Sequence, residues 1–209
     1  MRLEALKLSP DRMGRYWAEF EDGTRLGLYR QTVEDFGLYS GKTLSEEEMA
    51  CLRQAAGQMS AKMRAVRIVS ATSVSKRALE ERLVQKGEDP DQARQAVQWM
   101  EELNLVDDRT TAEQVVRSCI GKGYGPSRAR QALYEKRIPK QYWEEAMEGY
   151  PNQSEKIEAF LRGRLDADSD DKQIRRAVDA LIRRGHSYGA IRKVLSELSF
   201  DTEEFTEEE

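Results

Sequence analysis

The chain has little of what several common kinds of protein need. Its 209 residues include two cysteines and one histidine, so neither a disulfide framework nor a zinc site built from such ligands is expected. No apolar run approaches the roughly 18 to 20 residues of a membrane helix. The first residues also lack the apolar stretch of a secretory signal. These absences predict a protein of the cytoplasm, where thiols stay reduced, with no membrane contact.

Motifs of catalysis are missing as well. Neither a phosphate-binding loop nor a dinucleotide-binding glycine fingerprint occurs. The single histidine, His186, follows Gly185 at an expected turn, with no cysteine nearby to form a nucleophilic pair. Asp107 and Asp108 are adjacent, and at a helix start such residues act more readily as caps than as catalytic acids. We therefore expect no enzyme activity, no catalytic residue, no cofactor and no metal.

Charge is abundant but nearly balanced. The chain has 34 basic and 38 acidic residues. Six of the acidic residues lie in the tail 201–209, which contains no base and is expected to be disordered. Without them, 34 basic residues face 32 acidic ones, whereas dedicated DNA-binding proteins usually carry a larger basic excess. The tail is either a solubilising segment or a shield over a basic surface.

Strand signals are confined to the first 40 residues. Apolar and aromatic runs alternate there with turn signals, at 3–8, 15–20 and 24–29. Asp22-Gly23 between the last two runs is typical of a hairpin turn. A three-stranded antiparallel sheet is predicted over 1–40, and its apolar face needs cover from the helices that follow.

Helices are expected from Ser45 onward. Ser45 and Glu48 have the spacing of a capping box, in which each side chain bonds the other residue's backbone amide. The helix that begins there is predicted to connect the sheet to the rest of the chain over 45–70. It either continues to about Val69 or breaks near Gly57.

An internal repeat organises the remaining chain. Equivalent leucines stand at three positions, about one three-helix unit apart, at Leu83, Leu133 and Leu181. Each is followed by a basic residue and a turn, at Lys86-Gly87, Lys136-Arg137 and Arg184-Gly185. Apolar residues with helical spacing form two matching stripes, at 112, 115, 116, 119 and 120 and at 174, 177, 178, 181 and 182.

Capping signals agree with these boundaries. Prolines are expected at first helical positions, at Pro90, Pro126 and Pro139. Asp89 and Ser187 are expected as N-caps, and glycines as helix ends, at Gly87, Gly123 and Gly185. The predicted fold is mostly α: a small antiparallel β module precedes three tandem three-helix units in an elongated curved rod. The units are predicted at 71–106, 107–150 and 152–199, before the acidic tail 200–209.

Three stretches resemble the recurring motifs of the RecX family of regulatory proteins. They are Leu105-Val106-Asp107-Asp108-Arg109, Lys122-Gly123-Tyr124-Gly125-Pro126-Ser127-Arg128 and Arg183-Arg184-Gly185-His186-Ser187-Tyr188. The resemblance covers roughly 70–198, and the strand module resembles an extension carried by some members. The chain departs from the family pattern where aromatics are usual, at Thr111, Glu88 and His186, and where glycine is usual, at Arg137.

The resemblance implies a partner, the filament of RecA recombinase on single-stranded DNA. Members of the family are understood to lie in the filament groove and to limit filament growth, ATPase, recombinase and co-protease activity, and so to act in homologous recombination, DNA repair and the SOS response. The chain is then expected to be a monomer without enzyme activity. The alternative is a stand-alone helix-turn-helix-like DNA-binding protein, which would bind duplexes in a salt-dependent way without the recombinase.

Ten basic residues are candidates for contact with RecA or DNA phosphates. They are Arg128, Arg130, Lys136, Lys140, Arg175, Arg176, Arg183, Arg184, Arg192 and Lys193. Arg176 and Arg183 share one side of a helix, either as a partner-binding face or as a solvated face balanced by Asp179. Gly123 to Pro126 either mark a helix boundary or offer free amides to a phosphate. Tyr124 or Tyr188 is a candidate exposed anchor.

Overall fold

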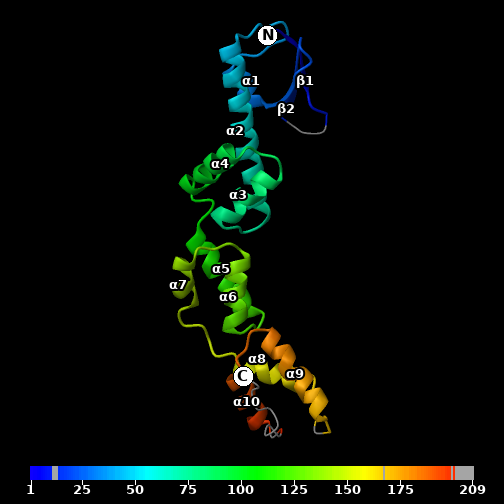
Figure 1. Cartoon of the computed structure of the whole chain (residues 1–209), viewed down its shortest axis with the longest axis vertical. Coiled ribbons are helices and arrows are strands. Elements are labelled where there is room, and N and C mark those ends of the chain that lie inside the picture. Colours follow the sequence, from blue (N-terminus) through cyan, green and yellow to red (C-terminus); the bar gives the residue numbers. More distant parts are fainter. Residues whose placement is uncertain (11–13, 167, 199, 201–209) are drawn as a thin grey trace. The chain divides into compact units, whose positions relative to one another are not determined.

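The fold is seen in a computed structural model that describes residues 1–10, 14–166, 168–198 and 200. It divides into two units, Met1–Asp107 and Asp108–Glu209 (Figure 1). Most of the described chain is helical, with one small sheet, as the sequence predicts. The expected acidic tail lies outside the described residues except for Phe200. None of the described helices combines the length and apolarity that crossing a bilayer requires.

The sheet is an antiparallel meander in the order β1-β2-β3, which confirms the expected three strands. The strands are β1 (Leu3–Leu8), β2 (Arg15–Phe20) and β3 (Arg25–Tyr29). At the expected hairpin turn, Gly23 takes a φ of +83° and the Asp22 carboxylate accepts hydrogen bonds from Thr24. The short helix α1 (Arg30–Asp35) follows β3 directly.

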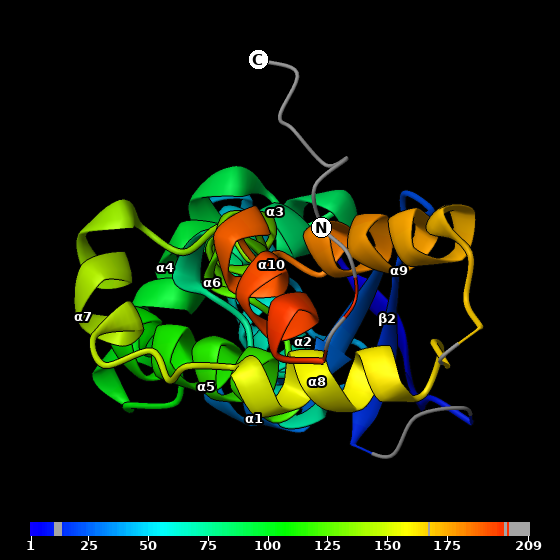
Figure 2. The same cartoon turned by 90° about the horizontal axis from the view of Figure 1, so that it is seen from below.

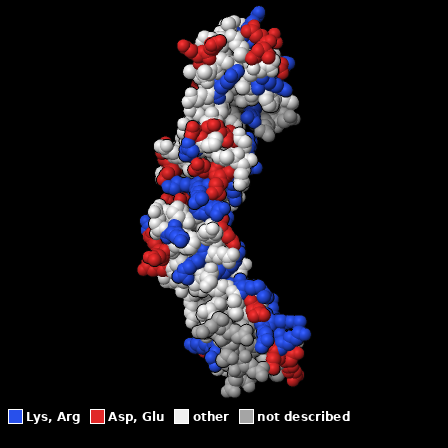
Figure 3. Space-filling model, viewed as in Figure 1, with Lys and Arg blue, Asp and Glu red and all other residues white. Residues whose placement is uncertain are grey.

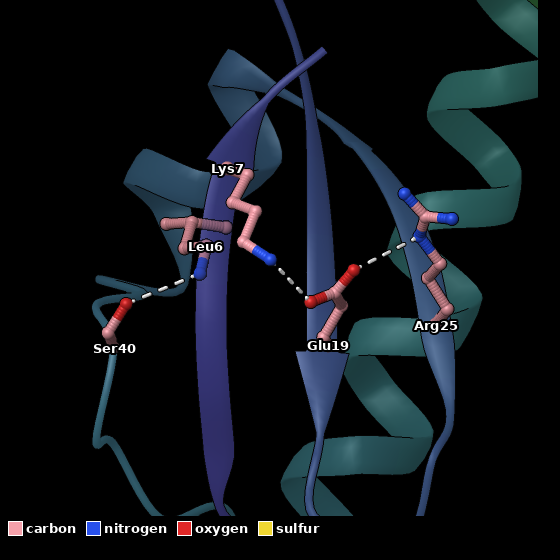
Figure 4. A network of polar contacts seen from close by, with 5 residues as sticks. All are labelled: Leu6, Lys7, Glu19, Arg25 and Ser40. Atoms are coloured by element: carbon pink, nitrogen blue, oxygen red, sulfur yellow. Dashed lines mark hydrogen bonds and ion pairs between the residues drawn. The ribbon is translucent and has the colours of Figure 1, made fainter.

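The two faces of the sheet have different partners. On the exposed face, the carboxylate of Glu19 on β2 forms ion pairs with Lys7 on β1, at 3.0 Å, and Arg25 on β3, at 3.5 Å (Figure 4). The other face buries apolar side chains against the long helix α2 (Glu46–Ala71). Helix α2 therefore supplies the cover that a three-stranded sheet needs.

Helix α2 begins with the predicted capping box between Ser45 and Glu48 and continues unbroken through Gly57. A Cβ atom at Gly57 would lie 2.3 Å from the Gln92 side chain on α4 (Pro90–Glu102), so this glycine lets the two helices approach closely. Helix α3 (Lys76–Gln85) completes a core between α2 and α4 around Leu79, Leu83 and Met100.

The second unit has two apolar cores. Helices α5 (Asp108–Gly121), α6 (Pro126–Glu135) and α7 (Trp143–Met147), with the 3-10 turn η1 (Lys140–Tyr142), enclose the first. Helices α8 (Ser154–Arg162), α9 (Asp171–Arg183) and α10 (Tyr188–Glu197) surround the second, as the view in Figure 2 shows. The repeat leucines Leu83, Leu133 and Leu181 are all buried.

Most expected helix boundaries are confirmed. Pro90 and Pro126 occupy first helical positions, and the Asp89 and Ser187 side chains accept hydrogen bonds from amides of the next turn. Pro139 is different: it precedes η1 as its N-cap, and the α-helix begins only at Trp143. The expectation of a first helical position there is wrong, because the chain makes a 3-10 turn before the helix.

Two further residues depart from the repeat pattern. Arg137 takes a φ of +58° at the turn after the second repeat leucine, where the other two repeats have glycine. Those glycines, Gly87 and Gly185, take φ values of +88° and +86°. The expected apolar stripe on α9 is also one residue too long, because Ile182 is 47% exposed. A residue one step beyond Leu181 is turned by about 100° around the helix, away from the buried side.

Candidate partner-binding surfaces

The exposed side of α9 is basic. Arg175, Arg176 and Arg183 lie in solvent, whereas Ile174 and Leu181 on the opposite side are buried. Figure 3 shows Lys and Arg side chains gathered over this helix. Within the described residues, neither Arg176 nor Arg183 forms an ion pair with a carboxylate of its own helix. Both guanidinium groups are exposed, and guanidinium forks match carboxylates and phosphates.

A groove of about 590 Å³ lies between α6 and the end of α9. Its lining residues are Ser127, Arg128, Gln131, Glu135, Ile182, Arg183 and Gly185. The fold thus brings together two basic candidates, Arg128 and Arg183, that are 55 positions apart in the chain. Arg128 is partly neutralised, because its guanidinium forms a 2.9 Å ion pair with Glu135. Arg183 gives the groove its more accessible charge.

A backbone joint holds α6 against the α9–α10 turn at one end of this groove. The Gly125 amide donates to the Arg184 carbonyl at 2.9 Å, and the Ser127 amide donates to the Gly185 carbonyl at 3.3 Å. A Cβ atom at Gly125 would lie 2.0 Å from the Gly185 oxygen, and one at Gly185 would lie 2.2 Å from the Arg128 nitrogen. Of the two interpretations of Gly123 to Pro126, the helix boundary is confirmed, because α5 ends at Gly121 and α6 begins at Pro126. Free amides for a phosphate are not present there, since the amides of Gly123, Tyr124 and Gly125 donate to backbone carbonyls.

Arg184 and His186 complete the joint. The Arg184 guanidinium donates to the Lys122 carbonyl at 3.0 Å and lies over the rings of Tyr124 and Phe160. His186 is buried, and its Nε2 lies 3.0 Å from the Gly123 oxygen. Burial lowers the pKa of His186, so the neutral ring, which can donate one hydrogen bond, is favoured. The structure therefore places Arg184 in a structural contact, away from the exposed basic face.

The other basic candidates lie outside the groove. Arg130 is exposed on α6, Lys140 is exposed at the start of η1, and Lys136 is half-buried at the end of α6. Arg192 and Lys193 are exposed on α10. The candidate tyrosines Tyr124 and Tyr188 are half-buried and pack against the unit's cores.

The sequence analysis missed three exposed apolar side chains at equivalent places. Val84, Tyr134 and Ile182 are 40%, 61% and 47% exposed. Each comes one residue after a repeat leucine, so the leucine alignment contained the signal that would have found them. Single exposed apolar residues are ordinary on protein surfaces. Their recurrence gives each of the three repeats an exposed apolar side chain at the same position, one helix turn or less from a basic residue.

Across the described residues, no group of three or more histidine, cysteine or acidic side chains could hold a metal ion. Cys119 is buried in the α5–α7 core, and burial raises the pKa of its thiol. A thiol of this kind is a packing residue and a weak nucleophile.

The fold and surfaces define a class: a helical-repeat protein with a small sheet and with exposed basic residues on its repeats. Comparisons make the assignment specific. The family model of the RecX second three-helix domain matches residues 107–147. The regulatory protein RecX of Clostridioides difficile is 25% identical over 207 residues, 96% of each chain. That of Xanthomonas axonopodis pv. citri is 30% identical over 132 residues, which cover 62% of this chain and 82% of the relative.

Solved structures agree on the fold. A crystal structure of regulatory protein RecX matches 93% of this chain and 98% of its own, with 20% identity and a TM-score of 0.63. RecX from Lactobacillus salivarius matches 69% of this chain and 98% of its own, with 23% identity and a TM-score of 0.60. The chain belongs to the RecX family of regulatory proteins.

Proposed function

We propose that this chain is a non-enzymatic regulator of RecA recombinase. It binds the RecA filament on single-stranded DNA, in the filament groove, and limits filament growth, so that recombinase and co-protease activity fall. Membership of the RecX family supports the regulatory role. The surface of the repeats supports the mode of binding.

The observation that carries the proposal is the recurrence of one contact position. Val84, Tyr134 and Ile182 are exposed at equivalent places in successive repeats, and the exposed Arg183 stands beside the last of them. A filament offers the same surface again and again along its length. A chain that presents equivalent contacts on several repeats gains affinity from each, as linked binding sites do. A monomer suffices for this mode of binding.

The basic face of α9 supplies the ionic part of the contact. Arg175, Arg176 and Arg183 would meet acidic side chains of the recombinase or phosphates of its DNA. Ionic contacts on an exposed face are screened by salt, and the Debye length is about 8 Å at physiological ionic strength. Inhibition is therefore expected to weaken as the salt concentration rises.

The test is a titration of recombinase ATPase on single-stranded DNA at two salt concentrations. The triple variant Arg175→Glu, Arg176→Glu, Arg183→Glu should need about tenfold more protein for the same inhibition, since it reverses three contacts. A control with the same change in net charge is Arg53→Glu, Arg77→Glu, Arg94→Glu, on exposed positions of the first unit. Circular dichroism checks that both variants keep their helices.

Two outcomes would count against the proposal in different ways. Full inhibition by the well-folded α9 variant would remove this face from the contact. No inhibition by the unaltered chain, together with salt-sensitive binding to duplex DNA alone, would favour a stand-alone DNA-binding protein.

A further inference from the structure

A second basic site lies in the first unit, and none of the basic residues predicted from the sequence belongs to it. An open pocket of about 530 Å³ is formed between the C-terminal part of α2 and helix α3. Its lining residues are Arg64, Arg67, Ile68, Ala71, Thr72, Arg82 and Lys86. Four of these seven side chains are cationic and none is acidic. The apolar wall comes from Ile68 and Ala71.

One of the four cations has a structural partner. The Arg64 guanidinium forms an ion pair with Glu88, and the same carboxylate accepts a 3.0 Å hydrogen bond from Ser60. Glu88 is 8% exposed, so its charge needs this partner. Arg64 is thereby fixed in place and its charge is balanced.

The other three cations have no carboxylate partner in the part of the chain that the structure describes. Among the described residues, Arg67, Arg82 and Lys86 form no ion pair with a carboxylate. Within the described residues, the Arg67 side chain donates one hydrogen bond. It goes to the Met63 carbonyl of the same helix, at 3.2 Å. Elsewhere in the same unit basic side chains do find acids, as Arg77 does with Glu81.

Helix ends account for only part of this charge. Helix α2 ends at Ala71 and α3 at Gln85, beside the pocket, and each C-terminus carries about half a negative charge. Together they offset about one of the three unpaired cations. Arg82 and Lys86 also stand four apart on one helix, a spacing at which like charges repel. About two positive charges therefore remain to be met by a ligand.

We propose that this pocket binds backbone phosphates of single-stranded DNA. A DNA strand carries one charge per nucleotide, so it can set two phosphates against Arg67, Arg82 and Lys86 at once. The arginine forks suit phosphate oxygens, and the wall of Ile68 and Ala71 suits the sugar. An acidic peptide would match these cations only if it carried adjacent carboxylates, whereas every nucleotide of a DNA strand carries a phosphate. The inference extends the proposed function, whose filament contains such a strand, but concerns binding by this chain alone.

The test compares two double variants with equal changes in charge. Arg67→Glu, Lys86→Glu alters two exposed cations of the pocket and leaves Arg64 and its buried partner intact. Arg77→Glu, Arg94→Glu alters two exposed cations that are paired with acids outside the pocket. Binding of the full chain to a fluorescent oligothymidylate is measured by anisotropy over a series of salt concentrations.

The pocket variant should bind the oligonucleotide about tenfold more weakly at low salt. Its slope of log affinity against log salt should be shallower by about 1.4, the value for two phosphate contacts on a single strand. Arg67→Gln, Lys86→Gln should give an intermediate loss, since it removes charge without reversing it. Inorganic pyrophosphate should displace the oligonucleotide from the unaltered chain.

An unchanged affinity and salt slope in the folded pocket variant would overturn the inference. So would a variant that keeps oligonucleotide binding but loses inhibition of the recombinase, because the pocket would then contact protein. The α9 triple variant separates the two proposals: it should inhibit about tenfold more weakly and keep the salt slope that the pocket contributes. If the unaltered chain fails to inhibit the recombinase but the pocket results hold, only the proposed function fails.

Discussion

The two units bury different kinds of side chain at one equivalent position of the repeat. The position two residues after the repeat's basic residue is buried in each repeat, and it is Glu88 in the first unit but Ile138 and His186 in the second. Glu88 forms an ion pair with Arg64, whereas burial lowers the pKa of His186 and its ring bonds the Gly123 carbonyl. The repeat therefore fixes where a side chain is buried, and neighbouring elements decide whether that side chain carries charge.

The largest effect on stability is expected in the second unit, at the backbone contact between α6 and the α9–α10 turn. Gly125→Ala would place a Cβ atom 2.0 Å from the Gly185 oxygen, which is backbone and cannot turn aside. A loss of about 2 to 4 kcal/mol in the free energy of unfolding is expected from such overpacking, measured by urea denaturation.

The matched control is Gly189→Ala in α10. A Cβ atom at Gly189 meets nothing within 4 Å. Alanine is also the better helix former, so this variant should be unchanged or more stable by up to about 1 kcal/mol. Equal losses at both glycines would show that the close backbone contact is not what holds the joint.

In the first unit, Glu88→Ala should be the most harmful loss of a side-chain contact. It leaves the half-buried Arg64 without its carboxylate, at a cost of about 2 to 3 kcal/mol in stability. Glu81→Ala removes the acid of an exposed pair with Arg77 and should change stability by less than about 1 kcal/mol. Thermal and urea unfolding would measure both. Similar small effects would mean that Glu88 is solvated rather than buried with its partner.

The second unit should respond to pH through His186. Burial lowers its pKa in the folded state below the ordinary 6.5. The unfolded chain therefore binds the proton first as the pH falls. The contribution of the neutral His186 ring to stability is complete above about pH 6.5. It is lost as the pH falls from there through the lowered pKa of the folded state.

His186→Phe provides the comparison, since it removes the titrating ring and keeps an aromatic side chain. Urea unfolding between pH 7.5 and 5 should show that the difference in stability between the unaltered chain and the variant changes in this window. A pH-independent difference would show that His186 titrates alike in the folded and unfolded chain.

Residues that act locally were predictable from the sequence. Ser45 and Glu48 form a capping box from four consecutive positions, and Leu83, Leu133 and Leu181 are buried because helical spacing marks the apolar side. The α9 basic face was predictable for the same reason, since it is the side opposite the buried stripe.

Features made by packing between elements were not predictable. Gly125 and Gly185 lie against each other across 60 positions of chain, and Arg67 and Lys86 line one pocket only because α2 packs on α3. Apolar periodicity says which side of a helix is buried, but it does not say which polar residues of two helices share a pocket. Arg184 was misplaced on the exposed face because its contact with the Lys122 carbonyl depends on that packing.

The smallest expected effect is at the turn of the middle repeat. Arg137 holds a φ of +58°, where its equivalents are Gly87 and Gly185. The left-handed conformation costs a residue with a Cβ atom about 1 to 2 kcal/mol relative to glycine, although glycine also loses more freedom on folding. Arg137→Gly should therefore raise the free energy of unfolding by about 0.5 to 1 kcal/mol, measured by urea denaturation. Gly87→Ala should lower it by a similar amount, because alanine would enter the same conformation in open space. If Arg137→Gly destabilises the chain instead, the contacts of the arginine side chain outweigh the backbone strain, and the three turns are held by different means.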